Sequence, residues 1–288
     1  METSIPRVVA VLGRGVLTPG SPLVPADDLG FTRGDGCFDA LRVVRDAEGV
    51  RVDHATRHLE RFARSAAAMG LPPIDVAAWT GLVHEAAEAW EGEGEAVCKV
   101  IWTRGGEFVA SDPVGVALVA PVPGSCVPLR VAALTTGRRA DAFRDAPWLL
   151  GGVKTISYAT NAAAKREAAR RGADDAVFVS SDGYLLEGPT SALVVARHGL
   201  LDTTPTAHTG ILPSVTLAVI AEHAAAAGRE VRERLMKPEE LGLATGVWLV
   251  SAIRGVCPVV ELDGRPLPFN PRITRTLARW AGFAPAEG

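Results

Sequence analysis

Cysteine is scarce in this sequence, with four residues in a chain of 288. They lie far apart and form neither a C-x-x-C nor a C-x-x-H spacing, at Cys37, Cys98, Cys126 and Cys257. Small zinc modules and disulfide-stapled secreted domains need closely spaced or repeated cysteines. The sequence therefore indicates neither, and we expect a protein of the reducing cytosol with a cytoplasmic location.

The sequence also lacks runs of like charge and long apolar runs. Its 33 acidic and 30 basic residues are interspersed and leave a formal net charge of -3. Without a basic stripe, neither a nucleic acid nor an anionic membrane surface is an expected partner. No apolar stretch approaches the roughly 18 residues of a membrane span, and the N-terminus has no basic flank leading into an apolar core. We therefore expect no membrane span and no export signal.

What the chain does contain is enough apolar sequence for two cores. Hydrophobic residues make up 48% of the chain, and its length suits one large domain or two ordinary ones. The Pro/Gly/Ser cluster PVPGSCV, at 121–127, is the best linker candidate. We expect a smaller α+β domain at 1–120 and a larger α/β domain at 128–288, which carries the lysine described below.

Periodicity predicts the elements of both parts. In 55–70, apolar residues recur at helical spacing, and Gly70 followed by two prolines marks the end of that helix. Further helices are predicted at 77–90, 158–172 and 213–228, with a short one near the C-terminus. A hairpin is predicted from 176–181 and 184–188. Other strands are predicted at 7–20, 38–44, 49–54, 96–106, 114–120, 129–135, 191–196, 247–253 and 258–264.

Four residues or segments suggest chemistry. Lys154 follows a Gly-Gly pair and precedes an alanine-rich helix, and Glu187 closes a hairpin. A partly desolvated lysine can bind pyridoxal 5'-phosphate covalently, and that cofactor also needs a carboxylate at its ring nitrogen. Its phosphate needs a cation and backbone N–H groups, which Arg61 and the helix head at 210–211 can supply. Each of these residues taken alone is also typical of a solvated surface charge.

Two other candidate sites have weaker support. His54 and His58 are four residues apart, but no third ligand stands near them in the sequence, so we expect no metal site. Ser191 is not surrounded by the G-x-S-x-G pattern of a nucleophilic serine, so a structural or cofactor-contacting hydroxyl is the expected role.

Seven motifs in order along nearly the whole chain resemble the class IV pyridoxal-phosphate enzymes. They are RGDGCFDALRVV, HLERFARSA, KVIWTRGG, GVKTISYATN, DGYLLEGPTSALVV, TGILPS and SAIRGVCPVVELDG. The resemblance implies an α+β, two-domain fold of type IV, like the D-amino-acid and branched-chain aminotransferases, with pyridoxal 5'-phosphate between the domains. It also implies a homodimer that acts on a small-molecule amino substrate.

Roles follow from the resemblance position by position. Lys154 corresponds to the catalytic Schiff-base lysine, Glu187 to the partner of the pyridine nitrogen, and Arg61 to the phosphate-binding arginine. The implied cofactor-binding set is Arg61, Lys154, Glu187, Thr190, Ser191, Ile211, Leu212 and Ala252. The threonines that branched-chain enzymes place at the phosphate are absent here, so Ile211 and Leu212 are expected to donate backbone N–H groups. Hydroxyl groups are expected from Ser214, Ser251 or Thr190.

The motifs resemble most closely those of 4-amino-4-deoxychorismate lyases, which release 4-aminobenzoate and pyruvate. The segment after T-R-G reads GGEFVASD and lacks the arginine and histidine with which D-amino-acid aminotransferases bind the substrate carboxylate. Candidate substrate residues are Phe38, Arg104 and Arg254, although both arginines are equally typical of surface ion pairs. The alternative is a class IV aminotransferase acting on D-amino or branched-chain amino acids. A non-catalytic binding protein of the same fold is the remote alternative.

Overall fold

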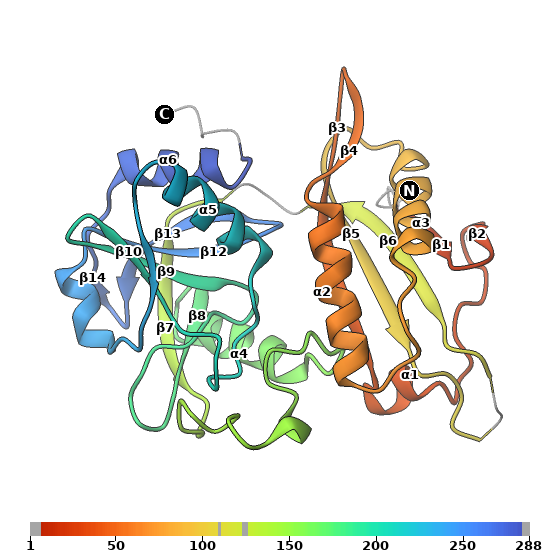
Figure 1. Ribbon diagram of the computed structural model, residues 1–288, viewed down its shortest axis with the longest axis horizontal. Coiled ribbons are helices and arrows are strands. Elements are labelled where there is room, and N and C mark those ends of the chain that lie inside the picture. The colour runs from red at the N-terminus through yellow and green to blue at the C-terminus, as the bar shows by residue number, and fades with distance from the viewer. Residues whose placement is uncertain (1–6, 109–110, 123–125, 284–288) are drawn as a thin grey trace. The chain divides into compact units, whose positions relative to one another are not determined.

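The computed structural model describes residues 7–108, 111–122 and 126–283 (Figure 1). Contacts divide the chain into two units, of which the first comprises 1–124 with 153–157 and the second 125–152 with 158–288. The first boundary falls inside the predicted linker. The segment 153–157, which contains Lys154, groups with the first unit, whereas the sequence led us to assign that lysine to the larger domain.

The first unit is built on a six-stranded antiparallel sheet in the order β2-β1-β6-β5-β3-β4. Its strands are β1 (Val8–Val11), β2 (Gly15–Val16), β3 (Gly36–Asp46), β4 (Gly49–Val52), β5 (Gly94–Thr103) and β6 (Gly115–Pro121). The long strands β3 and β5 pair over ten residues. Along β5, the buried residues Ala96, Cys98, Val100 and Trp102 alternate with more exposed ones, as an antiparallel sheet with one covered face requires.

Helices α2 (Ala55–Ala68) and α3 (Val76–Glu88) cover this sheet, and a short α1 (Leu29–Arg33) precedes β3 (Figure 1). Phe62 of α2 meets Trp79 of α3 edge to face at 4.9 Å, and Trp79 meets Trp102 of β5 at 5.9 Å. Such aromatic contacts add to the burial energy of the core. The predicted helix at 55–70 is confirmed.

The second unit has an eight-stranded mixed sheet in the order β11-β10-β9-β12-β13-β7-β8, with β14 paired to β13. The strands are β7 (Leu129–Thr135), β8 (Asp175–Val179), β9 (Ala192–Arg197), β10 (Leu200–Thr203), β11 (Val231–Glu233), β12 (Gly246–Ser251), β13 (Gly255–Leu262) and β14 (Arg265–Pro266). On β12, Val247 and Leu249 enter one core cluster, and Trp248 and Val250 enter another. Both faces of this strand are buried, which explains its unbroken apolar sequence.

Helices α4 (Ala159–Arg170), α5 (Val215–Ala226) and α6 (Pro271–Trp280) belong to this unit, together with the 3-10 turns η1 (Pro147–Leu149) and η2 (Pro238–Leu243). Figure 1 shows α5 and α6 on one side of the sheet, and both contribute to one of its clusters. The hairpin predicted at 176–188 forms, with an irregular second arm. β8 is a regular strand, and 184–188 returns along it with a bridge between Leu185 and Val179 and backbone bonds between Phe178 and both Leu186 and Glu187.

Cys126 and Cys257 form a disulfide, whereas the sequence indicated no disulfide framework. Their separation of 131 residues gave no sequence signal. Proximity comes from the sheet, because β13 pairs with β7 in a register that places Val259 opposite Leu129. Cys257 and Cys126 lie just before these partners, with Cα atoms 5.4 Å apart. Over the described parts of the chain, no helix is long and apolar enough to cross a membrane.

Candidate active site

The segment that carries Lys154 is bonded through its backbone to the first unit. Phe38 of β3 donates its N–H to the Lys154 carbonyl at 2.9 Å, and Ile156 donates to the Gly36 carbonyl at 2.9 Å. The Lys154 N–H donates to the hydroxyl of Ser65 on α2 at 3.2 Å. A Cβ on Gly36 would lie 2.9 Å from the Ile156 side chain. Glycine there allows the close approach that fixes the Lys154 backbone.

The ammonium group of Lys154 lies over the ring of Phe38, with Nζ 4.5 Å from the ring centroid. An ammonium group in such a position is attracted to the face of the ring by a cation–π interaction. The structure thus places Lys154, the predicted catalytic residue, beside Phe38, a predicted substrate residue. Both side chains are half-buried, so they are shielded from bulk water only in part.

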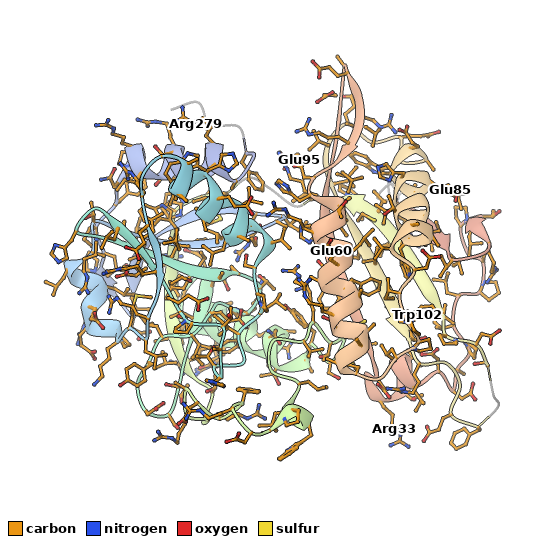
Figure 2. The ribbon with its side chains drawn as sticks, viewed as in Figure 1. Arg33, Glu60, Glu85, Glu95, Trp102 and Arg279 are labelled. Carbon is orange, nitrogen blue, oxygen red and sulfur yellow. A yellow bond between two sulfur atoms is a disulfide. The ribbon has the colours of Figure 1, made fainter. Side chains whose placement is uncertain are left out.

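Arg61 lies on α2 and is buried, although it stands off the apolar stripe of the helix. The preceding residue, Glu60, is exposed on α2 (Figure 2). The Arg61 guanidinium donates from Nε to Oδ2 of Asp39 at 2.8 Å and from Nη2 to Oδ1 at 2.7 Å. His58, also on α2, places its Nδ1 2.9 Å from Asp39 Oδ1. Burial alone would raise the pKa of Asp39, but Arg61 and His58 together hold that pKa below its usual range.

Cys37, the residue before Phe38, is the thiol nearest in sequence to these groups. Burial and then the charge of Asp39 raise the pKa of Cys37 to about 12. A thiol is a nucleophile only as its thiolate. Cys37 therefore stays protonated near neutral pH.

Glu187 lies in the second unit, in the extended segment that follows Leu185. Its carbonyl accepts the N–H of Phe178 on β8 at 2.8 Å, which fixes its backbone. Its Oε2 accepts the backbone N–H of Leu212 at 3.2 Å. The Leu212 N–H, which the resemblance assigns to the phosphate, therefore donates to the Glu187 carboxylate here. This bond links the predicted ring-nitrogen partner to the loop before α5.

That loop is shaped by glycine and an aromatic ring. Gly210 has φ of +74°, and the ring of Phe143 lies 2.4 Å from where its Cβ would stand. Gly152 donates its N–H to the Gly210 carbonyl at 2.9 Å. Only glycine permits both the positive φ and this close packing. Beyond the loop, Ser214 caps α5 by accepting the Leu217 N–H at 3.2 Å, so the Ser214 hydroxyl is engaged at the helix start.

The turn at 188–191, which contains Thr190 and Ser191, is held by side chains from two directions. Tyr158 and Asn161 both donate to the carbonyl of Pro189, at 3.0 and 2.7 Å. Arg254 donates to the hydroxyl of Ser191 at 3.0 Å and to the buried carboxylate of Asp175. These contacts fix the turn that the resemblance places at the cofactor.

Arg254 and Ala252 belong to the turn between β12 and β13, which follows Ser251, the last residue of β12. The Arg254 N–H donates to the Ser251 hydroxyl at 3.2 Å. A hydroxyl that accepts one bond retains its own O–H as a donor, so Ser191 and Ser251 keep the donors expected of them. The guanidinium of Arg254 is already paired with Asp175, and its predicted contact with substrate stays a prediction.

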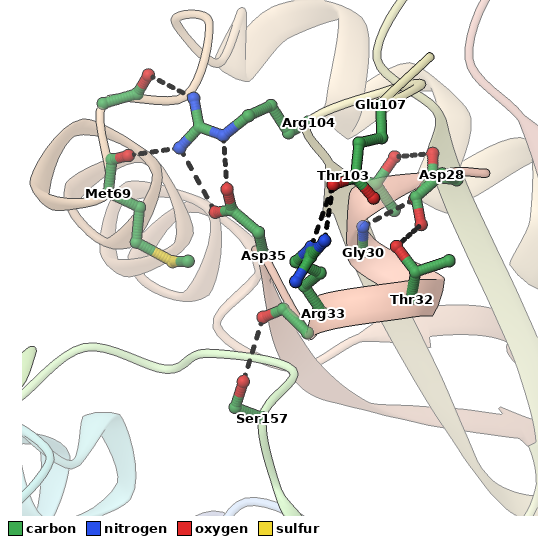
Figure 3. Close-up of polar contacts among 12 residues, drawn as sticks. Asp28, Gly30, Thr32, Arg33, Asp35, Met69, Thr103, Arg104, Glu107 and Ser157 are labelled. Carbon is green, nitrogen blue, oxygen red and sulfur yellow. Dashed lines mark hydrogen bonds and ion pairs between the residues drawn. The ribbon is translucent and has the colours of Figure 1, made fainter.

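Arg104 is a bridge within the first unit (Figure 3). Its guanidinium pairs with both carboxylate oxygens of Asp35 and donates to the carbonyls of Met69 and Gly70, at 2.7 and 3.1 Å. These two carbonyls follow the last turn of α2, where a cation is favourable because the helix dipole is negative. The structure thus favours the ion-pair interpretation of Arg104 over a substrate contact.

No metal site accompanies these groups in the described residues, because no cluster there holds three possible ligands. His54 and His58 do not act as a pair. His58 is buried against Asp39, and His54 begins α2 with a left-handed backbone.

A model of class IV aminotransferases matches residues 36–262. The chain belongs to the class IV aminotransferases. A bifunctional aminodeoxychorismate lyase / D-amino acid transaminase of Mycobacterium tuberculosis is 39% identical over 279 residues, covering 92% of this chain and 94% of its own. The predicted resemblance and fold are confirmed, and so is the pyridoxal-phosphate cofactor that the resemblance implied.

Two solved structures of class IV enzymes show the likeness in three dimensions. A hypothetical aminotransferase from M. tuberculosis in its PLP-bound form is 37% identical, covers 97% of this chain and 99% of its own, and has a TM-score of 0.89. A fold IV transaminase from Curtobacterium pusillum is 36% identical, covers 96% of this chain and 98% of its own, and has a TM-score of 0.88.

Each unit, taken by itself, carries groups of the kinds that the cofactor needs. The first unit offers an amine at Lys154 for the aldehyde and a buried guanidinium at Arg61 for the phosphate. The second offers a carboxylate at Glu187 for the ring nitrogen, with hydroxyl and N–H donors on two turns. Sequence reasoning missed the residues that hold these groups, namely Asp39, Ser65, Phe143, Tyr158, Asn161 and Asp175. Most of them act across elements, where sequence spacing carries no signal.

Proposed function

We propose that this enzyme is a 4-amino-4-deoxychorismate lyase that releases 4-aminobenzoate and pyruvate, a step toward folate. The observation that carries the proposal is the 39% identity, over nearly the full length of both chains, to a protein named for this lyase activity. The absence of arginine and histidine from GGEFVASD, at 105–112, supports it, because no carboxylate clamp of the D-specific type is encoded there. A cytoplasmic location is part of the proposal.

The residues divide the work. When bound, pyridoxal phosphate supplies an electron sink joined to the substrate amine. In this proposal the Lys154 amine first holds the cofactor and, once displaced, takes the proton from the carbon that bears nitrogen. Glu187 keeps the ring nitrogen protonated through its negative charge. Arg61 binds the phosphate, with the loop at 210–212. Loss of the enolpyruvyl group is then driven by aromatisation of the ring that remains.

An aminotransferase activity is the second candidate. The same M. tuberculosis relative is also named a D-amino acid transaminase, and a structure 37% identical to this chain was solved with α-ketoglutarate and PMP. An aminotransferase leaves its cofactor in the amine form after the first half-reaction and so requires a keto acid for turnover. A lyase restores the aldehyde form in every cycle. The requirement for a keto acid therefore separates the two functions.

The test is to supply the purified holoenzyme with enzymatically made aminodeoxychorismate and no keto acid, and to follow 4-aminobenzoate by fluorescence. We expect many equivalents of product per enzyme, and none from Lys154→Ala. With D-alanine, L-leucine or L-glutamate and a keto acid, we expect only slow conversion. Absence of 4-aminobenzoate together with rapid, keto-acid-dependent turnover of an amino acid would instead establish the aminotransferase.

A further inference from the structure

A carboxylate interrupts an apolar row on β3. Alternate residues of the strand face the core under α2, and four of them are fully buried: Cys37, Asp39, Leu41 and Val43. Three of these side chains suit that environment, whereas an ionised carboxylate there is costly unless it is paired and hydrogen-bonded. Asp39 must therefore be stabilised by partners that reach it from another element.

Those partners come from one face of α2. His58, Arg61 and Ser65 are spaced three and four residues apart, and all three are buried. This spacing places them side by side on the helix. Ser65 binds the Lys154 backbone, and the other two bind Asp39. One polar face of α2 thus contacts both the Lys154 segment and the Asp39 carboxylate.

The Asp39–Arg61 contact fixes the plane of the guanidinium. The two bonds from Nε and Nη2 to the two carboxylate oxygens form a planar fork, which allows neither group to rotate independently. His58 holds the carboxylate in turn, through Oδ1. The Arg61 and Asp39 side chains are 8% and 0% exposed. Buried ion pairs of this kind add little net stability compared with an apolar replacement, so stability alone does not account for it.

We propose that Asp39 is a positioning residue, which sets the guanidinium of Arg61 in the orientation that binds the cofactor phosphate. The proposal rests on the phosphate-binding role given to Arg61 under the proposed function. Asp39 itself does not contact the cofactor in this scheme. Its effect should therefore depend on the phosphate group, and it should vanish for a ligand that is identical except that the phosphate is missing.

Pyridoxal is that ligand, since it has the same aldehyde and ring and lacks the phosphate. The experiment measures dissociation constants of the apoenzyme for pyridoxal phosphate and for pyridoxal, by absorbance titration. For Asp39→Asn we expect the affinity for pyridoxal phosphate to fall about tenfold or more, as for other residues that orient a ligand-binding side chain. The affinity for pyridoxal should not change. In Asp39→Asn/Arg61→Met the loss should equal that of Arg61→Met alone, because coupled residues are not additive.

Asp202→Asn is the matched control. Asp202 is also fully buried and pairs with two arginines, Arg232 and Arg234, but it lies on β10 of the second unit and touches none of the proposed phosphate ligands. Its replacement should leave both dissociation constants unchanged. If Asp39→Asn is insoluble, the two dissociation constants are measured on Asp39→Glu instead. This variant keeps the charge but moves it by one methylene group.

Distinct results separate the two ideas. An Asp39 variant that leaves both constants unchanged, or weakens both equally, overturns the positioning role while leaving the lyase proposal intact. If Arg61→Met leaves pyridoxal phosphate binding unchanged, the role of Arg61 is wrong and the inference fails with it. If the phosphate-specific loss is found but 4-aminobenzoate is not released, the inference stands and the proposed reaction falls.

Discussion

The carboxylate of Glu187 has two roles in the proposed enzyme, one structural and one electrostatic. Oε2 accepts the Leu212 N–H, which orders the loop before α5, and under the proposed function the negative charge also keeps the ring nitrogen protonated. A neutral amide preserves the first task, because its carbonyl oxygen still accepts an N–H, and abolishes the second. Structure and charge can thus be separated at this position by one substitution.

Glu187→Gln should therefore keep its cofactor and lose most of its turnover. We expect the rate of 4-aminobenzoate release to fall roughly 10²-fold, the typical effect of removing one preorganised electrostatic group. Cofactor content, read from the absorbance of the purified protein, should match that of the unmodified enzyme. Retained turnover together with lost cofactor would contradict the role proposed for this carboxylate.

The sequence alone was informative for residues whose role is local. Lys154, Glu187 and Arg61 stand in short motifs, and the chemistry of pyridoxal phosphate demands their residue types. Asp39 stands in one of the same motifs, yet its role was missed, because its partners lie on α2 and the contact is tertiary. A clue was available: an acid in the core-facing register of β3, between Cys37 and Leu41, is anomalous in an alternating strand.

At the scale of elements, α2 is the scaffold of the first unit. It supplies Arg61 and Ser65, and its C-terminal carbonyls are bound by Arg104. Arg33 forms the neighbouring ion pair, with Glu107, but its side chain is 65% exposed against 33% for Arg104 (Figure 3). The two arginines therefore provide a half-buried and an exposed version of the same substitution.

Arg104→Met should lower the free energy of unfolding by about 1 to 3 kcal/mol, because it leaves the Asp35 carboxylate and two helix-end carbonyls without their donor. Arg33→Met should lower it by much less, because solvent screens this exposed pair. Denaturant titration measures both. The KM for aminodeoxychorismate should not change in Arg104→Met. A large rise in KM with unchanged stability would return Arg104 to the substrate-binding set.

Helices and strands with a strong apolar periodicity could be predicted from the sequence. Short strands that form only because a neighbouring strand pairs with them could not. α2, α4, α5 and the long strands follow from apolar spacing and from Gly and Pro at their ends. β10, β11 and β14 are two to four residues long and exist because neighbouring strands offer bonding partners. The segment 184–188 shows the converse, because its strand-like sequence bonds back to β8 without forming a regular strand.

For the whole molecule, we expect exposed aromatic side chains on the first unit to form a surface for a second copy. Phe31 is 74% exposed and Phe108 82% exposed. The backbone N–H groups of these two residues are bonded to the neighbouring Asp28 and Asp27, and Arg33 pairs with Glu107 between them. Large apolar side chains gathered at a surface are typical of interfaces. This supports the homodimer that the resemblance implied.

We expect light scattering coupled to gel filtration to give twice the chain mass of 30.2 kDa. Replacing Phe31 and Phe108 together by serine should shift the mass to that of one chain at low concentration. Leu243→Ser removes a similarly exposed apolar side chain from η2 of the second unit and serves as the control, with no expected change. An unaltered mass in the double variant would move the interface elsewhere.

The path of the chain has a consequence for how the protein is made. The first unit is not complete when residue 124 leaves the ribosome, because the segment 153–157 arrives later and bonds to Gly36, Phe38 and Ser65. Until then, the edge of β3 and the hydroxyl of Ser65 lack the groups that satisfy them in the finished protein. A fragment cut at the linker would thus carry Arg61 without its lysine. The first unit can therefore be completed only after Lys154 has been synthesised, because the five residues that complete it, 153–157, include this lysine.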